Sequence, residues 1–172
     1  MQIVPLSLDH EAALSALLAD FASVGETDVP GWFADPAWPW AKVVGDVNAW
    51  GRGERLPNGW STCTTRFLEE DGELLGLFNL RHELSEGLRR YGGHMGYAVR
   101  PSARRQGHAT RLCRAGMSLG AELGIERFLL TCEPTNVGSV VVIERCGGVL
   151  EDEYFHEGLG RLVRRYWIDY SA

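Results

Sequence analysis

The chain has 172 residues, of which 45% are apolar and 23% are charged, and its formal net charge is −6 at pH 7. A chain of this size can bury about 70% of its unfolded surface in one core, so we expect a single domain over residues 1–172. The negative charge argues against general nucleic-acid binding. No apolar run reaches the roughly 18 residues of a membrane span, and the start of the chain lacks the features of a signal peptide, so we expect a cytoplasmic protein without a membrane partner.

The four cysteines stand at positions 63, 113, 132 and 146, with no C-x-x-C pair and no clustering with histidines. This spacing fits neither a zinc site nor a disulfide framework. We therefore expect free, buried thiols and no metal.

The first third of the chain predicts a strand from Ile3 to Leu6 and then a helix capped by Asp9, whose apolar residues recur at helical spacing up to Phe21. Residues 30–60 contain five of the six tryptophans among several prolines, with a short helix expected from Pro39 to Trp50. Such a segment is typical of an aromatic cover packed on a sheet.

The remaining two thirds alternate between strand and helix patterns. Asp71-Gly72 is a strong hairpin signal between two strands, and Gly107 and Gly124 bound a helix with a face of small residues. The expected elements are strands at 61–70, 73–84, 94–99, 127–132, 149–155 and 161–170, a loop at 85–91, and helices at 107–124 and 137–146. This order predicts an α/β (α+β) fold with a mixed, mostly antiparallel sheet flanked by helices.

The turn after the strand at 94–99 has the features of an anion cradle. The first N–H groups of a helix lack partners within it, Gly107 permits close approach of a ligand, and charged side chains can add stronger hydrogen bonds. We expect a ligand with several phosphates to contact Arg104, Arg105, Gln106, Gly107, His108, Ala109 and Thr110. Neither the Walker pattern nor the Rossmann pattern is present.

Seven arginines and no acidic residue lie between Glu86 and Glu122. A locally bound anionic ligand explains this run, and a nucleic-acid patch is the alternative.

Arg104, Gly107 and Ala109 match the pattern [QR]-x-x-G-x-[GA], and a second segment runs from Thr131 to Ser139. Together they resemble the acetyl-CoA motif of the GNAT superfamily of N-acetyltransferases over residues 60–170. The resemblance implies acetyl-CoA as cosubstrate, inserted between two central strands that splay apart. It further implies that the cofactor is bound by the backbone of Tyr97, Ala98 and Val99 and by the side chains of Asn136 and Ser139. Asn136 is equally well explained as a helix N-cap, and the resemblance also makes the tryptophan-rich segment a candidate wall of the acceptor pocket.

The resemblance also implies direct attack of a primary amine, from a small molecule or a peptide, on the thioester. Gly93 stands where many relatives have a glutamate base, and Ile143 replaces a tyrosine that often protonates the thiolate. We therefore expect His94, whose reference pKa is near 6.5, to act as the base, with Glu133 acting through water as second candidate. The alternative for His94 is a structural bond to the Tyr91-Gly92 loop.

The alternative for the whole chain is a non-catalytic acyl-CoA-binding module that has lost its proton carriers. A weaker alternative is an RNA-binding domain, which the acidic balance disfavours. The sequence leaves open whether the protein forms a homodimer.

Overall fold

The computed structural model describes residues 1–27, 29 and 37–170. Along the chain the helices and strands are β1 (Gln2–Val4), η1 (Leu8–His10), α1 (Glu11–Ser23), α2 (Trp40–Ala49), η2 (Trp50–Arg52), β2 (Cys63–Glu70), β3 (Glu73–Arg81), α3 (Glu86–Arg90), β4 (Met95–Val99), η3 (Pro101–Ala103), α4 (His108–Glu122), β5 (Arg127–Cys132), α5 (Val137–Arg145), β6 (Val149–His156), η4 (Glu157–Leu159) and β7 (Arg161–Asp169).

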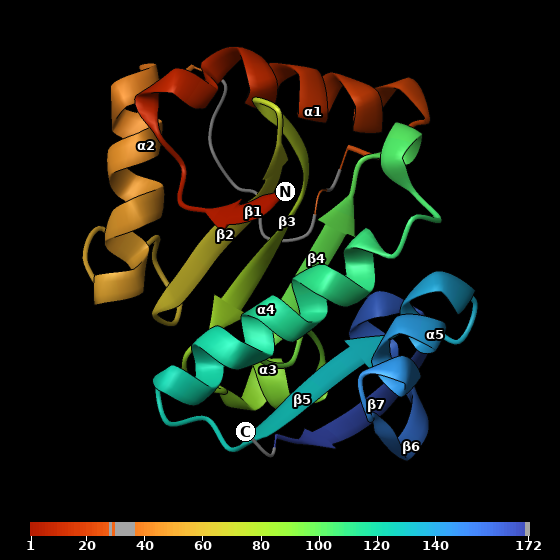
Figure 1. Cartoon of the computed structure of the whole chain (residues 1–172). Coiled ribbons are helices and arrows are strands. Elements are labelled where there is room, and N and C mark those ends of the chain that lie inside the picture. The colour runs from red at the N-terminus through yellow and green to blue at the C-terminus, as the bar shows by residue number, and fades with distance from the viewer. Residues whose placement is uncertain (28, 30–36, 171–172) are drawn as a thin grey trace.

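The strands form two antiparallel sheets that lie next to each other. Strands β1, β2, β3 and β4 make the first sheet in that order, and β5, β7 and β6 make the second. Figure 1 shows β4 and β5 pointing in diverging directions, with α4 in front of the lower part of β4. The mixed fold and the splayed central strands expected from the sequence are confirmed.

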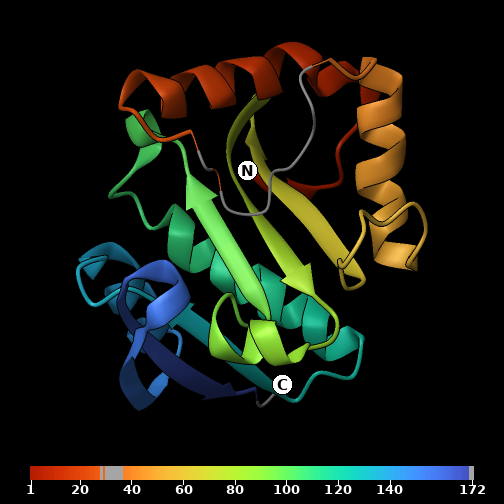
Figure 2. The ribbon, with the colours of Figure 1, turned by 180° about the vertical axis from the view of Figure 1, so that it is seen from behind.

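Two buried clusters hold the layers together, one on each face of the first sheet. The cluster under α4 joins both sheets, because Phe78 and Met95 of the first sheet pack in it with Phe128 and Tyr166 of the second. The cluster on the other face lies under α1 and α2 and is built around Phe21, Phe67, Trp50 and their neighbours. Figure 2 shows α1 and α2 on this second face, away from α4.

Three local expectations need correction. Asp9 does not cap the first helix: it lies inside η1, whose N-cap is Ser7 and whose start is fixed by the bond from the Ser7 amide to His10 Nδ1 at 3.1 Å, and α1 follows from Glu11. The expected loop at 85–91 contains helix α3, capped by Ser85 Oγ, which accepts from the Leu88 amide. Strand β3 ends at Arg81, and both of its faces are buried, because its side chains pack in the clusters on both faces of the sheet.

Candidate cofactor and acyl-transfer site

The gap between β4 and β5 is the central feature of the site. The chain just before β4 contacts β5, where the His94 amide donates to the Leu129 carbonyl at 2.7 Å and the Gly92 amide donates to Thr131 Oγ1 at 2.9 Å. Gly93 has a positive φ of 60°, and a Cβ there would lie 2.3 Å from the Leu129 oxygen. Only glycine fits this junction, so the glutamate of many relatives has no place at Gly93.

Beyond the junction, β4 turns a free backbone edge toward the gap. The Arg81 amide donates to the His94 carbonyl, and the Arg100 amide donates to the Leu75 carbonyl. These two bonds show which residues of β4 form hydrogen-bonded pairs with β3. In an antiparallel ladder, alternate residues point their polar groups to opposite sides. The backbone N–H and C=O groups of Ala98 therefore point toward β3, while those of Tyr97 and Val99 point toward the gap. Of the three residues predicted to bind the cofactor through their backbone, Tyr97 and Val99 are the two oriented to do so.

The start of α4 lies at the end of β4 and presents unpaired amides. Gly107 is the N-cap with φ 84°, no side chain caps the helix, and the first helical bond runs from the Arg111 amide to the Gly107 carbonyl. In the described residues, the amides of His108, Ala109 and Thr110 have no hydrogen-bond partner. Such a helix start favours an anion through its free donors and the helix dipole.

The basic side chains around this helix start have different surroundings. Arg105 and Gln106 are exposed and free to meet a ligand, but the His108 side chain is buried. Arg104 binds Glu26 with two hydrogen bonds of 2.9 and 2.5 Å, and its Nε donates to the Val99 carbonyl. In this structure Arg104 ties the loop to Glu26, and the phosphate contacts of the Arg104 and His108 side chains stay predictions.

Asp20 makes a second tie of the same kind. It accepts from Arg100 at 2.8 Å and from the Ser102 hydroxyl at 2.5 Å, and these hydrogen bonds lower its pKa. Sequence reasoning missed Asp20 and Glu26, because they lie about 80 residues before their partners. The only signal was charge: these acids precede a run of arginines that has no acid of its own.

A basic groove continues from the helix start along α4. Its volume is about 790 Å³, and it is lined by Gly107, Thr110, Arg111, Arg114, Ala115, Ser118, Arg145 and Tyr170. Three arginines and no acidic residue line it, so the groove suits a second anionic group of the same ligand.

Helix α5 forms the opposite side of the gap. The Asn136 side-chain oxygen accepts from the Ser139 amide at 3.0 Å, as an N-cap does, which leaves the Asn136 amide nitrogen for a ligand. The Tyr97 hydroxyl donates to the Ser139 carbonyl at 3.5 Å and so spans the gap from β4 to α5. Burial raises the pKa of Tyr97, which stays protonated at neutral pH.

His94 is placed differently from a general base. It is 8% exposed, and its Nδ1 accepts from the Leu129 amide at 2.8 Å. The single proton of the neutral ring then sits on Nε2, leaving no free lone pair. Burial, followed by the charges of Arg89 and Arg81, lowers the pKa of His94 to about 4, so the expected near-neutral value is wrong. The expected partner loop at Tyr91-Gly92 is also wrong, since Leu129 takes that place.

The second candidate base, Glu133, and the residue that replaces the tyrosine acid, Ile143, also have defined surroundings. Glu133 follows β5 and is paired with Arg161 at 2.7 Å. Ile143 is 1% exposed and packs in the cluster under α4. His94 contacts β5 at Leu129, whereas Glu133 follows the end of that strand and is paired with Arg161, so no described contact brings the two side chains together. Their catalytic roles stay predictions.

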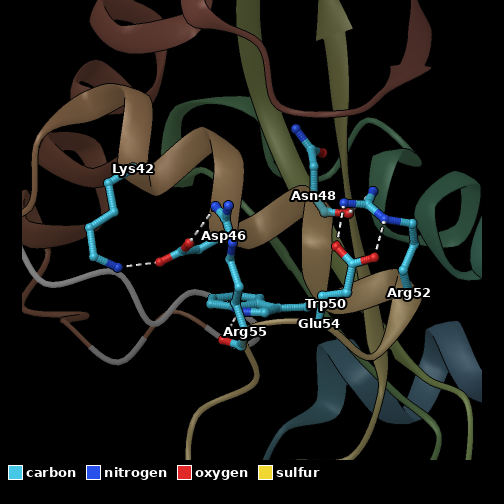
Figure 3. Close-up of polar contacts among 7 residues, drawn as sticks. All are labelled: Lys42, Asp46, Asn48, Trp50, Arg52, Glu54 and Arg55. Carbon is cyan, nitrogen blue, oxygen red and sulfur yellow. Dashed lines mark hydrogen bonds and ion pairs between the residues drawn. The ribbon is translucent and has the colours of Figure 1, made fainter.

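The described part of the tryptophan-rich segment packs against the first sheet. Trp50 is 1% exposed in the core, and Trp38, Trp40 and Trp60 pack against the same cluster. Figure 3 shows Asp46 of α2 between Lys42 and Arg55. Burial opposes the charge of Asp46, but hydrogen bonds from both cations outweigh it and lower the pKa of this carboxyl. These contacts fit the prediction that the segment is an aromatic cover packed on the sheet. Trp32, which belongs to the same segment, lies outside the described residues.

A family model matches most of the chain, including the strands beside the gap and the start of α4. The model of the acetyltransferase (GNAT) domain matches residues 1–149. The chain belongs to the GNAT acetyltransferase family. The expected family, acetyltransferase class and acetyl-CoA cosubstrate are thereby confirmed.

Solved structures of GNAT proteins share this fold at low sequence identity. The ribosomal-protein alpha-N-acetyltransferase RimL is 19% identical, with a TM-score of 0.65 over 98% of this chain and 94% of that one. RimJ from Mycobacterium smegmatis, solved with CoA disulfide, is 19% identical with a TM-score of 0.66 over 97% and 80%. The spermidine N-acetyltransferase SpeG from Vibrio cholerae is 17% identical with a TM-score of 0.62 over 98% and 95%. No curated protein sequence matches the chain.

The structure also bears on membranes and metals. No helix in residues 1–27, 29 and 37–170 is long and apolar enough to cross a membrane. Within the same residues, no three His, Cys, Asp or Glu side chains gather as a metal site requires.

Proposed function

We propose that this GNAT protein transfers an acetyl group from acetyl-CoA to a primary amine of a small molecule or peptide. The observation that carries the proposal is the edge of β4, which pairs with no strand of the second sheet, together with the unpaired amides at the start of α4. A linear cofactor with a thioester at one end and phosphates at the other fits such a path. The names of RimL and SpeG, a protein N-acetyltransferase and a spermidine N-acetyltransferase, support an amine acceptor.

Each part of the cofactor has a proposed partner in this arrangement. The pantetheine amides would bond the backbone of Tyr97 and the amide of Val99, whose carbonyl already accepts from Arg104 Nε, with the Asn136 amide and Ser139 on the other side. The diphosphate would bond the amides of residues 108–110 and the side chains of Arg105 and Gln106. The phosphate on the adenosine would lie in the groove lined by Arg111, Arg114 and Arg145.

Orientation is proposed to supply most of the rate. Holding the amine against the thioester in near-attack geometry can contribute about 7 to 11 kcal/mol, whereas a general base typically adds roughly 10²- to 10⁴-fold. Since the lone pairs of His94 and the charge of Glu133 are engaged, we infer that the amine loses its proton to water. The thiol product has a pKa near 8.5, so its thiolate can leave without a general acid.

We further infer that residues 1–172 act as one acyltransferase domain, because the buried cluster under α4 includes residues of both sheets. A cytoplasmic location is supported by four free cysteines. Whether the protein forms a homodimer, which the sequence leaves open, would be tested by the molar mass in solution.

The test is a screen of amine pools with acetyl-CoA, read by mass spectrometry for acetylated products and for released CoA. Transfer to any primary amine above the uncatalysed rate supports the proposal. CoA binding that stabilises the fold, without transfer to small amines or peptide amino groups, would instead support the non-catalytic alternative.

A further inference from the structure

Tyr97 reaches across the gap with its side chain, and the contact that holds it there is long. Its hydroxyl donates to the carbonyl of Ser139, which lies in the first turn of α5. The distance between the two oxygens is 3.5 Å, whereas a hydrogen bond from a hydroxyl to an oxygen is normally about 2.7–2.8 Å long. In the part of the chain that the structure describes, the hydroxyl makes no other hydrogen bond. The hydroxyl is therefore only weakly satisfied.

The Tyr97 ring lies on the face of the first sheet that carries α4. Tyr97 stands opposite Phe78 of β3 in the ladder, so the two side chains share one face of the sheet. Phe78 is fully buried in the cluster under α4, and the Tyr97 ring packs against the same cluster. A ligand lying in the gap would thus meet the Tyr97 backbone in the plane of the sheet and the Tyr97 side chain from one side.

The Ser139 carbonyl does not depend on the tyrosine. In an α-helix a carbonyl accepts from the amide four residues later, which for Ser139 is the amide of Ile143 within α5. This carbonyl therefore stays satisfied when the Tyr97 hydroxyl moves away. The hydroxyl itself sits against an apolar cluster, where a polar group without a partner is unfavourable. It can exchange the Ser139 carbonyl for a closer acceptor at little cost.

The pantetheine arm of the cofactor carries acceptors of this kind. A carbonyl oxygen has two lone pairs, so an amide carbonyl of the arm can accept from a strand and from a side chain at once. We propose that the Tyr97 side chain is a binding residue for the arm. When the cofactor enters the gap, the hydroxyl leaves the Ser139 carbonyl and donates to a carbonyl of the arm. This inference rests on the proposed position of acetyl-CoA in the gap.

The proposed contact concerns the arm and not the phosphates. Tyr97 lies within β4, whereas the unpaired amides proposed to bind the diphosphate begin at His108, after the strand has ended at Val99. The Tyr97 hydroxyl should therefore distinguish a ligand that has the arm from one that has only the nucleotide part of CoA. By fixing the arm at one point, it also limits the positions open to the thioester.

CoA and adenosine 3′,5′-bisphosphate form a matched pair of probes, because the second has the phosphorylated nucleoside without the arm. Tyr97→Phe keeps the ring and removes only the hydroxyl. In isothermal titration, this variant should bind CoA about two- to tenfold more weakly than wild type, which is the loss expected for one neutral hydrogen bond. Its affinity for adenosine 3′,5′-bisphosphate should be unchanged.

Tyr154→Phe is the matched control. The Tyr154 hydroxyl also donates to a backbone carbonyl, that of Arg90, but this contact joins β6 to the end of α3 and lies outside the gap. Its removal should leave the affinity for both probes unchanged. Melting curves of both variants show that they are folded.

Three results would overturn the inference. If Tyr97→Phe bound CoA as tightly as wild type, the hydroxyl would not contact the arm. If Tyr97→Phe lost the same factor with both probes, the side chain would maintain the shape of the site without contacting the arm. A wild-type protein that binds CoA no more tightly than adenosine 3′,5′-bisphosphate would overturn the proposed path of the arm through the gap, and this inference with it.

Discussion

His94 and Leu129 hold β4 and β5 together by a reciprocal pair of hydrogen bonds. The His94 amide donates to the Leu129 carbonyl at 2.7 Å, and the Leu129 amide donates to His94 Nδ1 at 2.8 Å. The imidazole thus takes the place of a backbone carbonyl where the two sheets meet. This pair closes one end of the gap, beyond which the strands diverge.

Replacing His94 should affect stability according to whether the acceptor at Nδ1 is kept. His94→Leu leaves the buried Leu129 amide without a partner and should lower the free energy of unfolding by about 1–3 kcal/mol. His94→Asn places a side-chain oxygen near the position of Nδ1 and should cost less. Urea denaturation at pH 7 measures both. Equal losses for the two variants would show that packing, not the hydrogen bond, is what His94 provides.

The same residue should make stability depend on pH. The pKa of His94 is lowered from 6.5 to about 4 in the folded protein, so the unfolded chain binds the proton more readily. The neutral ring makes its full contribution to the free energy of unfolding above pH 6.5. This contribution is lost as the pH falls toward 4, and the loss is about 3 kcal/mol in total. His94→Asn should remove this part of the loss. Identical pH dependence in wild type and His94→Asn would contradict the lowered pKa.

Catalysis should follow the titration of the acceptor amine rather than that of His94. We expect log kcat/KM to rise with a slope of about 1 up to the pKa of the amine, with no inflection near 6.5, in both wild type and His94→Asn. A limb near neutral pH that disappears in His94→Asn would restore His94 as the base. A limb that disappears only in Glu133→Gln would assign that role to Glu133.

The sequence predicted the elements that depend on local signals and missed the contacts that depend on folding. The hairpin at Asp71-Gly72 has φ values of 51° and 82°, as its sequence indicates, and the bounds of β5 agree residue for residue. The cradle at Gly107 likewise follows from a local pattern. The hydrogen-bond partner of a side chain does not follow from a local pattern. Whether His94 has a free nitrogen depends on Leu129, which lies 35 residues away, and no local pattern reports that contact.

The tie between Glu26 and Arg104 should weaken cofactor binding through its negative charge. Glu26→Gln removes that charge beside the helix start, so CoA should bind about two- to fivefold more tightly at low salt, with a smaller gain at high salt. Glu122→Gln, at the other end of α4, is the control and should change little. Isothermal titration at two salt concentrations measures the effect. Weaker binding in Glu26→Gln would mean that the tie orders the loop for the ligand.

Gly107 and Gly124 offer a matched pair for testing the cradle. Their φ values are 84° and 85°, and a Cβ at either position meets no atom within 4 Å, but they lie at opposite ends of α4. Valine at either position should therefore cost a similar backbone strain, about 1–2 kcal/mol of stability.

Only the valine at position 107 would occupy the space in front of the free amides, so Gly107→Val should abolish CoA binding while Gly124→Val keeps it. The readout is the stabilisation by CoA, which for a competent site at a hundred times its Kd is about 2.7 kcal/mol. If Gly107→Val were stabilised by CoA as much as Gly124→Val, the phosphates would bind elsewhere than at the start of α4. If neither wild type nor Gly124→Val were stabilised by CoA, the cofactor would not bind in the proposed gap at all.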